Sequence, residues 1–140
     1  MNNEHTIDLE GDINKLLDAL PLVLASKIRS LDGYFGIIEV VLDLGVKPQV
    51  RFLDRDLRLS DLSDTTVDDI NYIVSRLGTF NLDNRAGIER TLHRISAIRN
   101  RAGKILGLTL RVGRAILGSI EMISDIIKDG KNVLILGAPG

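Results

Sequence analysis

The clearest strand signal in the sequence is Ile105-Leu106-Gly107-Leu108-Thr109-Leu110-Arg111-Val112. Its leucines and its valine recur at every second position, which is the period of a strand buried on one face. The preceding residues Asn100–Gly103 have the composition of a turn. We therefore predict a hairpin over residues 93–112, although residues 89–98 taken alone also fit a helix.

A second hairpin is predicted upstream of the first. Large apolar residues occupy alternate positions from Ile38 to Leu44 and predict a strand. The segment Gly45–Pro48 has turn chemistry, and Gln49–Leu53 fits the returning strand. The charged run 54–64 has room for a short edge strand, whereas 79–88 has the composition of a loop.

Helical spacing of apolar residues marks the remaining elements. The predicted helices cover residues 13–20, 21–31, 66–77 and 116–127. Asp12 is a candidate cap for the first helix, and Thr66 with Asp69 resembles a capping box. Gly78 and Gly130 are candidate helix ends.

The predicted fold class is α+β. It comprises an N-terminal helical arm, two β-hairpins packed with helices, and a terminal helix and strand leading into a truncated phosphate-binding loop. We expect the arm at residues 1–33, the α+β domain at 34–113, and the beginning of a further domain at 114–140.

The composition of this 140-residue chain excludes several kinds of functional site. Zero cysteines exclude disulfides, thiol catalysis and cysteine-ligated metals. The two histidines, His5 and His93, are too far apart to suggest a metal site, and we predict a structural hydrogen-bonding role for His93. No apolar run reaches the roughly 18 residues of a membrane span. We therefore expect no metal site and no membrane span.

The formal net charge of −1 conceals a strong asymmetry. Residues 1–84 hold 8 Lys/Arg and 15 Asp/Glu, whereas residues 85–114 hold 8 Lys/Arg and one acid, Glu89. Arginine favours multidentate contact with phosphate or carboxylate. Two explanations remain open: the basic block faces acidic residues of its own fold, or it contacts an anionic partner. The candidate contacts are Arg85, Arg90, Arg94, Arg99, Arg101, Arg111 and Arg114.

The final eight residues resemble the start of a phosphate-binding loop. Val133–Leu136 is an apolar run typical of a strand covered on both faces, and it leads directly into glycine. Gly137, Ala138, Pro139 and Gly140 fit the first four positions of the loop. The loop continues with Gly-Lys and a Ser or Thr, and the lysine falls three positions after Gly140.

Several stretches resemble one family, the hypothetical chloroplast reading frame forty-five family of plastid and cyanobacterial ATPases. The resemblance covers roughly residues 38–140, and its most specific part runs from Asp83 to Arg101. The other matching stretches are Val40–Gly45, Arg51-Phe52, Gly107–Ala115 and Leu136–Gly140. The family is similar to the sporulation stage III protein AA and, more remotely, to hexameric secretion ATPases.

The resemblance implies an N-terminal accessory domain, or a fragment, of an AAA-type phosphate-loop ATPase in the chloroplast stroma or the cyanobacterial cytoplasm. It implies ATP and Mg²⁺ as cofactors and a homo-oligomer for the full-length relative. We expect no cofactor and no hydrolysis for this chain alone, because the loop lysine and hydroxyl are absent. By analogy, Arg99, Arg101, Arg111 or Arg114 reaches a nucleotide in the intact protein.

Two other functions remain open. The basic block 85–114 fits a module that tracks the phosphates of single-stranded nucleic acid, although it contains no aromatic residue to stack on bases. Alternatively, the acidic and basic regions of neighbouring copies pair, and the chain is an oligomerisation domain.

Overall fold

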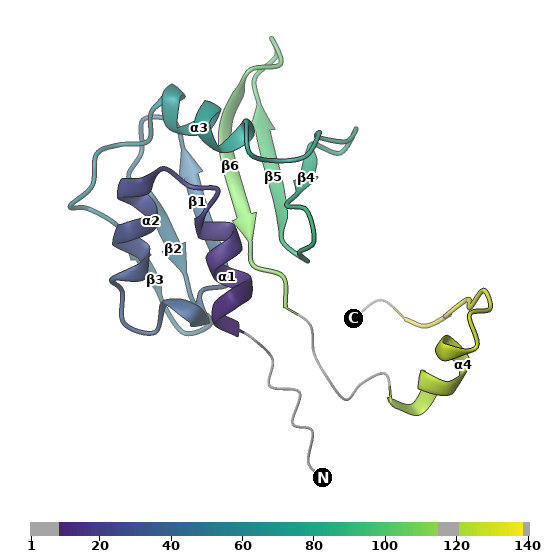
Figure 1. Ribbon diagram of the computed structural model, residues 1–140. Coiled ribbons are helices and arrows are strands. Elements are labelled where there is room, and N and C mark those ends of the chain that lie inside the picture. Colours follow the sequence, from purple (N-terminus) through teal and green to yellow (C-terminus); the bar gives the residue numbers. More distant parts are fainter. Residues whose placement is uncertain (1–8, 115–120, 139–140) are drawn as a thin grey trace. The chain divides into compact units, whose positions relative to one another are not determined.

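The computed structural model describes residues 9–114 and 121–138, which belong to two separate compact units. The first unit, Asp8–Arg114, holds a six-stranded sheet (Figure 1). The sheet order is β3-β2-β1-β6-β5-β4, and every neighbouring pair is antiparallel. The strands are β1 (Glu39–Asp43), β2 (Gln49–Arg51), β3 (Asp56–Arg58), β4 (Arg85–Gly87), β5 (Arg94–Arg99) and β6 (Ile105–Arg111).

Both predicted hairpins are confirmed. β1 pairs with β2, and β5 pairs with β6 through the turn at Asn100–Gly103. Residues 94–98 are therefore strand and not helix. The short edge strand within 54–64 is also present, as β3. The two hairpins join through β1 and β6, so that β6 lies in the interior of the sheet.

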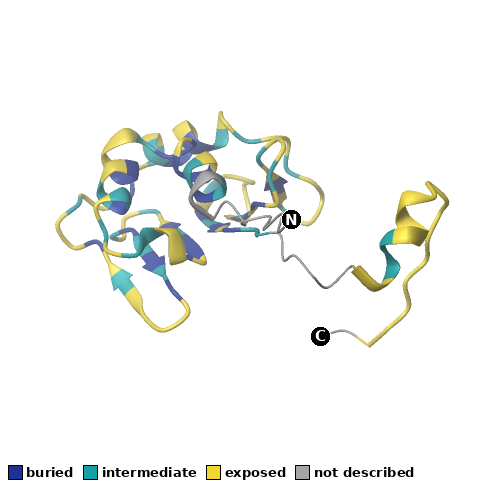
Figure 2. Cartoon of the chain, turned by 60° about the horizontal axis from the view of Figure 1, so that its bottom comes forward, coloured by how far each residue is buried: buried dark blue, intermediate teal, exposed yellow. Residues whose placement is uncertain are grey.

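The helices of this unit cover one face of the sheet. They are α1 (Leu9–Leu17), α2 (Leu22–Arg29), α3 (Val67–Val74) and the short 3₁₀ helix η1 (Tyr34–Gly36). α1 and α2 lie over the sheet in Figure 1, and Figure 2 shows the buried residues between the layers. Their side chains form one cluster with inward residues of the strands, including Ile13, Leu17, Ile28, Ile70, Leu108 and Leu110.

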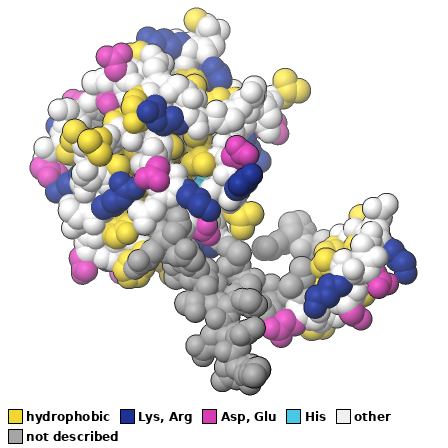
Figure 3. All heavy atoms as spheres, viewed as in Figure 1, with side chains coloured by type: hydrophobic (Ala, Val, Ile, Leu, Met, Phe, Trp, Pro, Cys, Tyr) yellow, Lys and Arg dark blue, Asp and Glu magenta, His cyan; other side chains and the backbone are white. Residues whose placement is uncertain are grey.

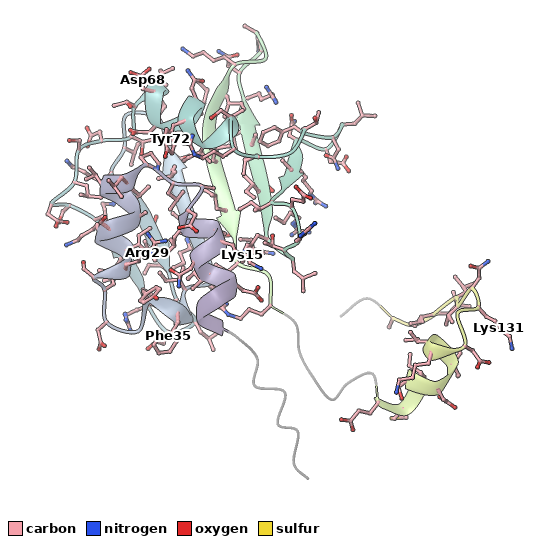
Figure 4. The ribbon with its side chains drawn as sticks, in the orientation of Figure 1. Lys15, Arg29, Phe35, Asp68, Tyr72 and Lys131 are labelled. Carbon is pink, nitrogen blue, oxygen red and sulfur yellow. The ribbon has the colours of Figure 1, made fainter. Side chains whose placement is uncertain are left out.

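The two N-terminal helices are tied to each other as well as to the sheet. Arg29 of α2 donates from Nε to Asn14 Oδ1 at 3.0 Å and from Nη2 to Asp18 Oδ1 at 2.6 Å (Figure 4). Pro21 precedes α2, where a fixed φ and a missing N–H suit a helix start. α1 begins at Leu9, so the predicted cap Asp12 lies inside the helix and that prediction is wrong.

The capping box of α3 is confirmed, with one change at the other end of the helix. Thr66 accepts the Asp69 N–H through Oγ1 at 3.1 Å, and Asp69 accepts the Thr66 N–H at 2.8 Å. The helix ends at Val74, earlier than predicted. Gly78 is not its cap, because the Gly78 N–H donates to the carbonyl of Gly87, the last residue of β4.

The segment 79–88 was predicted to be a loop and contains β4. Its alternation is too short to recognise, because only Ala86 of Arg85-Ala86-Gly87 is buried. The strand forms because β5 offers it a free edge, on which Ala86 pairs with Ile95. Asn84, just before β4, has φ of 55°, a conformation that asparagine tolerates in turns.

The described part of the second unit holds η2 (Glu121–Ile123) and α4 (Ser124–Lys128). It covers the end of the predicted helix 116–127, whose first residues lie outside the described part of the chain. Gly130 has φ of 68° and follows the end of α4, as expected for a helix stop. The predicted strand over Val133–Leu136 is not formed among the described residues: the run pairs with none of them, and Leu136 is 85 % exposed.

Candidate functional site

The sheet face opposite the helices carries most of the charge of the strands. Side chains alternate across a strand, so residues directly opposite each other on neighbouring strands share a face. The buried partners Val40, Leu110 and Ile95 mark the face toward the core. Their strand neighbours point the other way, and we call this surface the open face. The helix side also carries both acidic and basic side chains (Figure 3).

One row of the open face crosses all six strands. It runs from Asp56 through Arg51, Glu39, Arg111 and Arg94 to Gly87. The Glu39 side chain is 10 % exposed and lies between two guanidinium groups. Arg51 Nη1 donates to Glu39 Oε2 at 2.8 Å, and Arg111 Nη2 donates to Glu39 Oε1 at 3.4 Å. The buried carboxylate of Glu39 therefore accepts hydrogen bonds from two arginines.

A second row lies two residues further along the strands. It runs from Arg58 through Gln49, Val41, Thr109 and Ser96 to Arg85. The hydroxyl residues Ser96 and Thr109 are directly opposite each other, and Arg85 is directly opposite Ser96. The Arg85 side chain is exposed and makes no hydrogen bond or ion pair with the described residues. This half of the open face thus combines free guanidinium groups with hydroxyls.

Three of the predicted arginine contacts therefore gather on the open face: Arg85, Arg94 and Arg111. The sequence prediction did not include the other members of the two rows, because Glu39, Arg51 and Arg58 lie outside the block 85–114. The period-two alternation that marks Val40 and Val50 as inward also marks Glu39 and Arg51 as outward. The sequence could therefore have placed Glu39 and Arg51 on the open face.

Arg99 and Arg101 lie at the far end of β5 and beyond it. Arg99 pairs with Ile105 at the start of β6, whereas Arg111 ends β6. Six residues of strand separate these levels by about 20 Å at roughly 3.3 Å per residue. Arg99 donates to Asn84 Oδ1 and to the Gly103 carbonyl, both at 2.8 Å, and its guanidinium carbon lies 5.4 Å from the Phe80 ring centroid. Arg99 therefore stabilises the turn between β5 and β6.

Arg114 has a structural role within the first unit. Its Nη2 donates to the carbonyl oxygens of Phe35 at 2.5 Å and Ile37 at 2.8 Å. Burial lowers the pKa of Arg114 from its usual value, and the charge of Asp12 acts in the opposite direction. Arg90 differs again: it is an exposed loop residue with φ of 58°, and its contact to Glu89 is 3.8 Å.

His93 fastens the end of β6 to α1. The histidine is 4 % exposed; its Nδ1 accepts the Gly113 N–H at 3.0 Å, and its Nε2 lies 2.5 Å from the Asp12 carbonyl oxygen. Because Nδ1 accepts, the neutral ring carries its proton on Nε2. Burial lowers the pKa of His93, and the hydrogen bond to Asp12 opposes that shift. The structural role predicted for His93 is confirmed.

The predicted phosphate-loop residues fall into two groups. Gly137 and Ala138 are exposed and lie in no helix or strand. Pro139 and Gly140 lie outside the described residues. Within the described ranges, no group of three or more His, Asp or Glu side chains is placed to hold a metal ion, and no helix is long and apolar enough to cross a membrane.

Comparison with known proteins points to plastids. No family model matches the chain. Over 132 residues, 94 % of the chain, it is 46 % identical to the uncharacterized protein ycf45 of Porphyra purpurea. It is 43 % identical over 129 residues, 92 % of the chain, to SEEDLING PLASTID DEVELOPMENT 1 of Arabidopsis thaliana. A ycf45 protein of Cyanidium caldarium is 36 % identical over 130 residues, 93 % of the chain.

Two of these relatives carry the name ycf45, the family that the Asp83–Arg101 stretch resembles. The expected plastid or cyanobacterial location is confirmed by the same relatives. The chain spans 23 %, 19 % and 38 % of the length of these three proteins, so each of them contains a long region with no counterpart here.

Proposed function

We propose that the chain is the N-terminal accessory domain of a phosphate-loop ATPase of plastids or cyanobacteria and is not catalytic by itself. One observation carries the proposal. The compact unit ends at Arg114, and the unit that follows contains an apolar run leading directly into Gly137-Ala138-Pro139-Gly140. This is the order in which a buried strand enters a phosphate-binding loop.

The missing loop residues explain why the chain alone is expected to be inactive. In a phosphate-binding loop the backbone N–H groups surround the phosphates, the lysine reaches the terminal phosphates, and the Ser or Thr hydroxyl binds Mg²⁺. Only the first four loop positions are present here. ATP and Mg²⁺ are therefore proposed as cofactors of the longer protein.

The exposed Val133–Leu136 run is consistent with this proposal. Leu134 is 82 % exposed and Ile135 is 74 % exposed, which is costly for large aliphatic side chains. A parallel sheet buries such a strand on both faces. In the proposed protein, the rest of the ATPase domain supplies that sheet.

The test compares this chain with its parent protein. The reading frame after Gly140 is expected to encode a lysine at the third position, preceded by glycine and followed by serine or threonine. ATP turnover is expected for the parent protein and only background hydrolysis for the 140-residue chain. Turnover by the 140-residue chain, or a continuation without the lysine, contradicts the proposal.

A second candidate function concerns partners. The open face favours a nucleic-acid-binding role, because exposed arginines gather there on neighbouring strands.

We also propose a homo-oligomer for the parent protein, in which acidic and basic surfaces of neighbouring copies pair. Mass measurement of the parent protein at increasing concentration tests the latter, and a strict monomer at high concentration rules it out.

A further inference from the structure

Two arginines of the open face are placed directly against each other. Arg94 of β5 is the cross-strand partner of Arg111 of β6. Directly opposite residues have Cβ atoms about 4.5–5.5 Å apart, and like charges in such positions destabilise a sheet. A sheet that keeps this pair with only partial compensation from its own acids is suited to an anion from outside.

The compensation from the chain itself is small. The Arg94 side chain is exposed and makes no hydrogen bond or ion pair with the described residues. Arg111 reaches Glu39 Oε1 at 3.4 Å while Arg51 binds Oε2 at 2.8 Å, so the single negative charge of Glu39 is shared by two guanidinium groups. The Arg111 side chain remains 61 % exposed. The only acid between residues 85 and 114 is Glu89, which lies beyond β4 and not on a strand.

The surroundings of the pair add a third cation and two hydroxyls. Arg85 is opposite Ser96, and Ser96 is two residues from Arg94 on the same strand. Arg85 and Arg94 are thus diagonal neighbours, about 7–8 Å apart. Thr109 is opposite Ser96 and two residues from Arg111. We call Arg85, Arg94, Arg111, Ser96 and Thr109 the arginine cluster.

From this juxtaposition we propose that the arginine cluster binds successive phosphates of a single-stranded nucleic acid. Arginine, serine and threonine side chains are the groups that commonly contact phosphate backbones. The cluster extends over three strands, which suits an extended chain better than a compact ligand. Because these side chains contact phosphates and not bases, the binding is expected to be insensitive to base sequence.

This inference deepens the nucleic-acid role proposed above and rests on it, but it does not depend on the ATPase assignment. The proposed phosphate-binding site contains three arginines of the basic block 85–114: Arg85, Arg94 and Arg111. Arg99 and Arg114 are excluded because both donate to backbone carbonyls, and Arg101 is excluded because it lies in the β5–β6 turn.

The experiment measures binding of a fluorescent single-stranded oligothymidylate to the 140-residue chain by anisotropy at several salt concentrations. Three phosphate contacts predict a slope of log K against log salt of about −2, since each contributes roughly 0.7 on single strands. Arg94→Gln and Arg85→Gln are each expected to reduce the slope by about 0.7. Arg101→Gln is the matched control: it removes the same charge from a residue without a described partner and is expected to retain the slope.

The possible results separate this inference from the broader proposals. If Arg101→Gln weakens binding as much as Arg94→Gln, nucleic-acid binding stands and the arginine cluster is the wrong site. If no salt-sensitive binding occurs at low salt, both the cluster and the nucleic-acid role are overturned. Displacement of the oligonucleotide by ATP or by polyglutamate at equal charge concentration also overturns the proposal, in favour of a nucleotide or an acidic protein. ATP turnover by the parent protein is measured separately and tests only the ATPase assignment.

Discussion

His93 links three segments through one neutral ring. It accepts the N–H of Gly113 and contacts the Asp12 carbonyl oxygen, so it joins the residue before β5 to the chain after β6 and to α1. Gly113 is required for this arrangement, because a Cβ added there would overlap the Leu92 carbonyl oxygen at 1.9 Å. Protonation of Nδ1 would place an N–H against the Gly113 N–H and break the contact.

Stability is therefore expected to depend on pH through His93. Burial lowers the pKa of His93 in the folded state, whereas the unfolded value is about 6.5. The unfolded chain then binds a proton that the folded chain does not, so stability is complete above about pH 6.5 and falls as the pH decreases through that value. Asp12, Lys15 and Arg114 are the charged groups that act on the ring.

Urea unfolding at pH 8 and pH 5.5 measures this effect. His93→Gln retains hydrogen-bonding atoms but cannot titrate, so its free energy of unfolding is expected to fall less between the two pH values than that of the wild type. An equal fall in both proteins would show that other groups cause the pH dependence. His5 remains in both proteins and cancels in the comparison.

At the scale of elements, β6 connects the two hairpins. It pairs with β1 on one side and with β5 on the other, and its inward residues Leu108 and Leu110 are 1 % and 0 % exposed. Each hairpin alone is only marginally stable in water. The shared core that β6 contributes therefore stabilises the sheet as a whole.

Leu110→Ala is expected to lower the free energy of unfolding by about 2–5 kcal/mol, because it removes buried methyl groups and leaves a cavity. Leu82→Ala is the matched control: Leu82 is 104 % exposed, and the expected change is within about 0.5 kcal/mol. Chemical denaturation of both variants provides the measurement. Similar losses in the two variants would contradict the interior position of β6.

Some of the helices and strands could be predicted from local sequence patterns alone. Alternation over Ile105–Val112 predicts β6, and the Thr66–Asp69 spacing predicts the capping box, because both depend on near neighbours in the chain. β4 was missed because a three-residue strand has no measurable period and depends on the edge of β5. Val133–Leu136 has the composition of a strand but has no described partner strand, and a strand needs one.

At the scale of the whole molecule, the described core belongs to one unit. Every buried residue of the hydrophobic cluster lies between Ile13 and Val112, and the described residues after Arg114 contribute none to it. α1 and α2 supply a large part of this cluster. The sheet and its helices are therefore expected to fold without the second unit.

A chain that stops after Arg114 is expected to unfold cooperatively, with a Tm within a few degrees of the 140-residue chain. Thermal unfolding followed by circular dichroism measures this. Because the arginine cluster is retained, the truncated chain is also expected to bind the oligonucleotide with an unchanged salt slope. A broad transition or loss of the fold would show that residues after Arg114 contribute to the core.

The α+β class, both hairpins, the helix start at Thr66 and the concentration of arginine in residues 85–114 follow from the sequence, because each is a property of neighbouring residues. Which arginines share a surface depends on the strand order and on the contacts of each side chain. Pairing of β1 with β6 places Glu39 beside Arg111, and the turn and the carbonyls of Phe35 and Ile37 take Arg99 and Arg114 away from the open face. The physical reason is that alternation sets the face on which a side chain lies, whereas the order of strands depends on burying one shared core between sheet and helices.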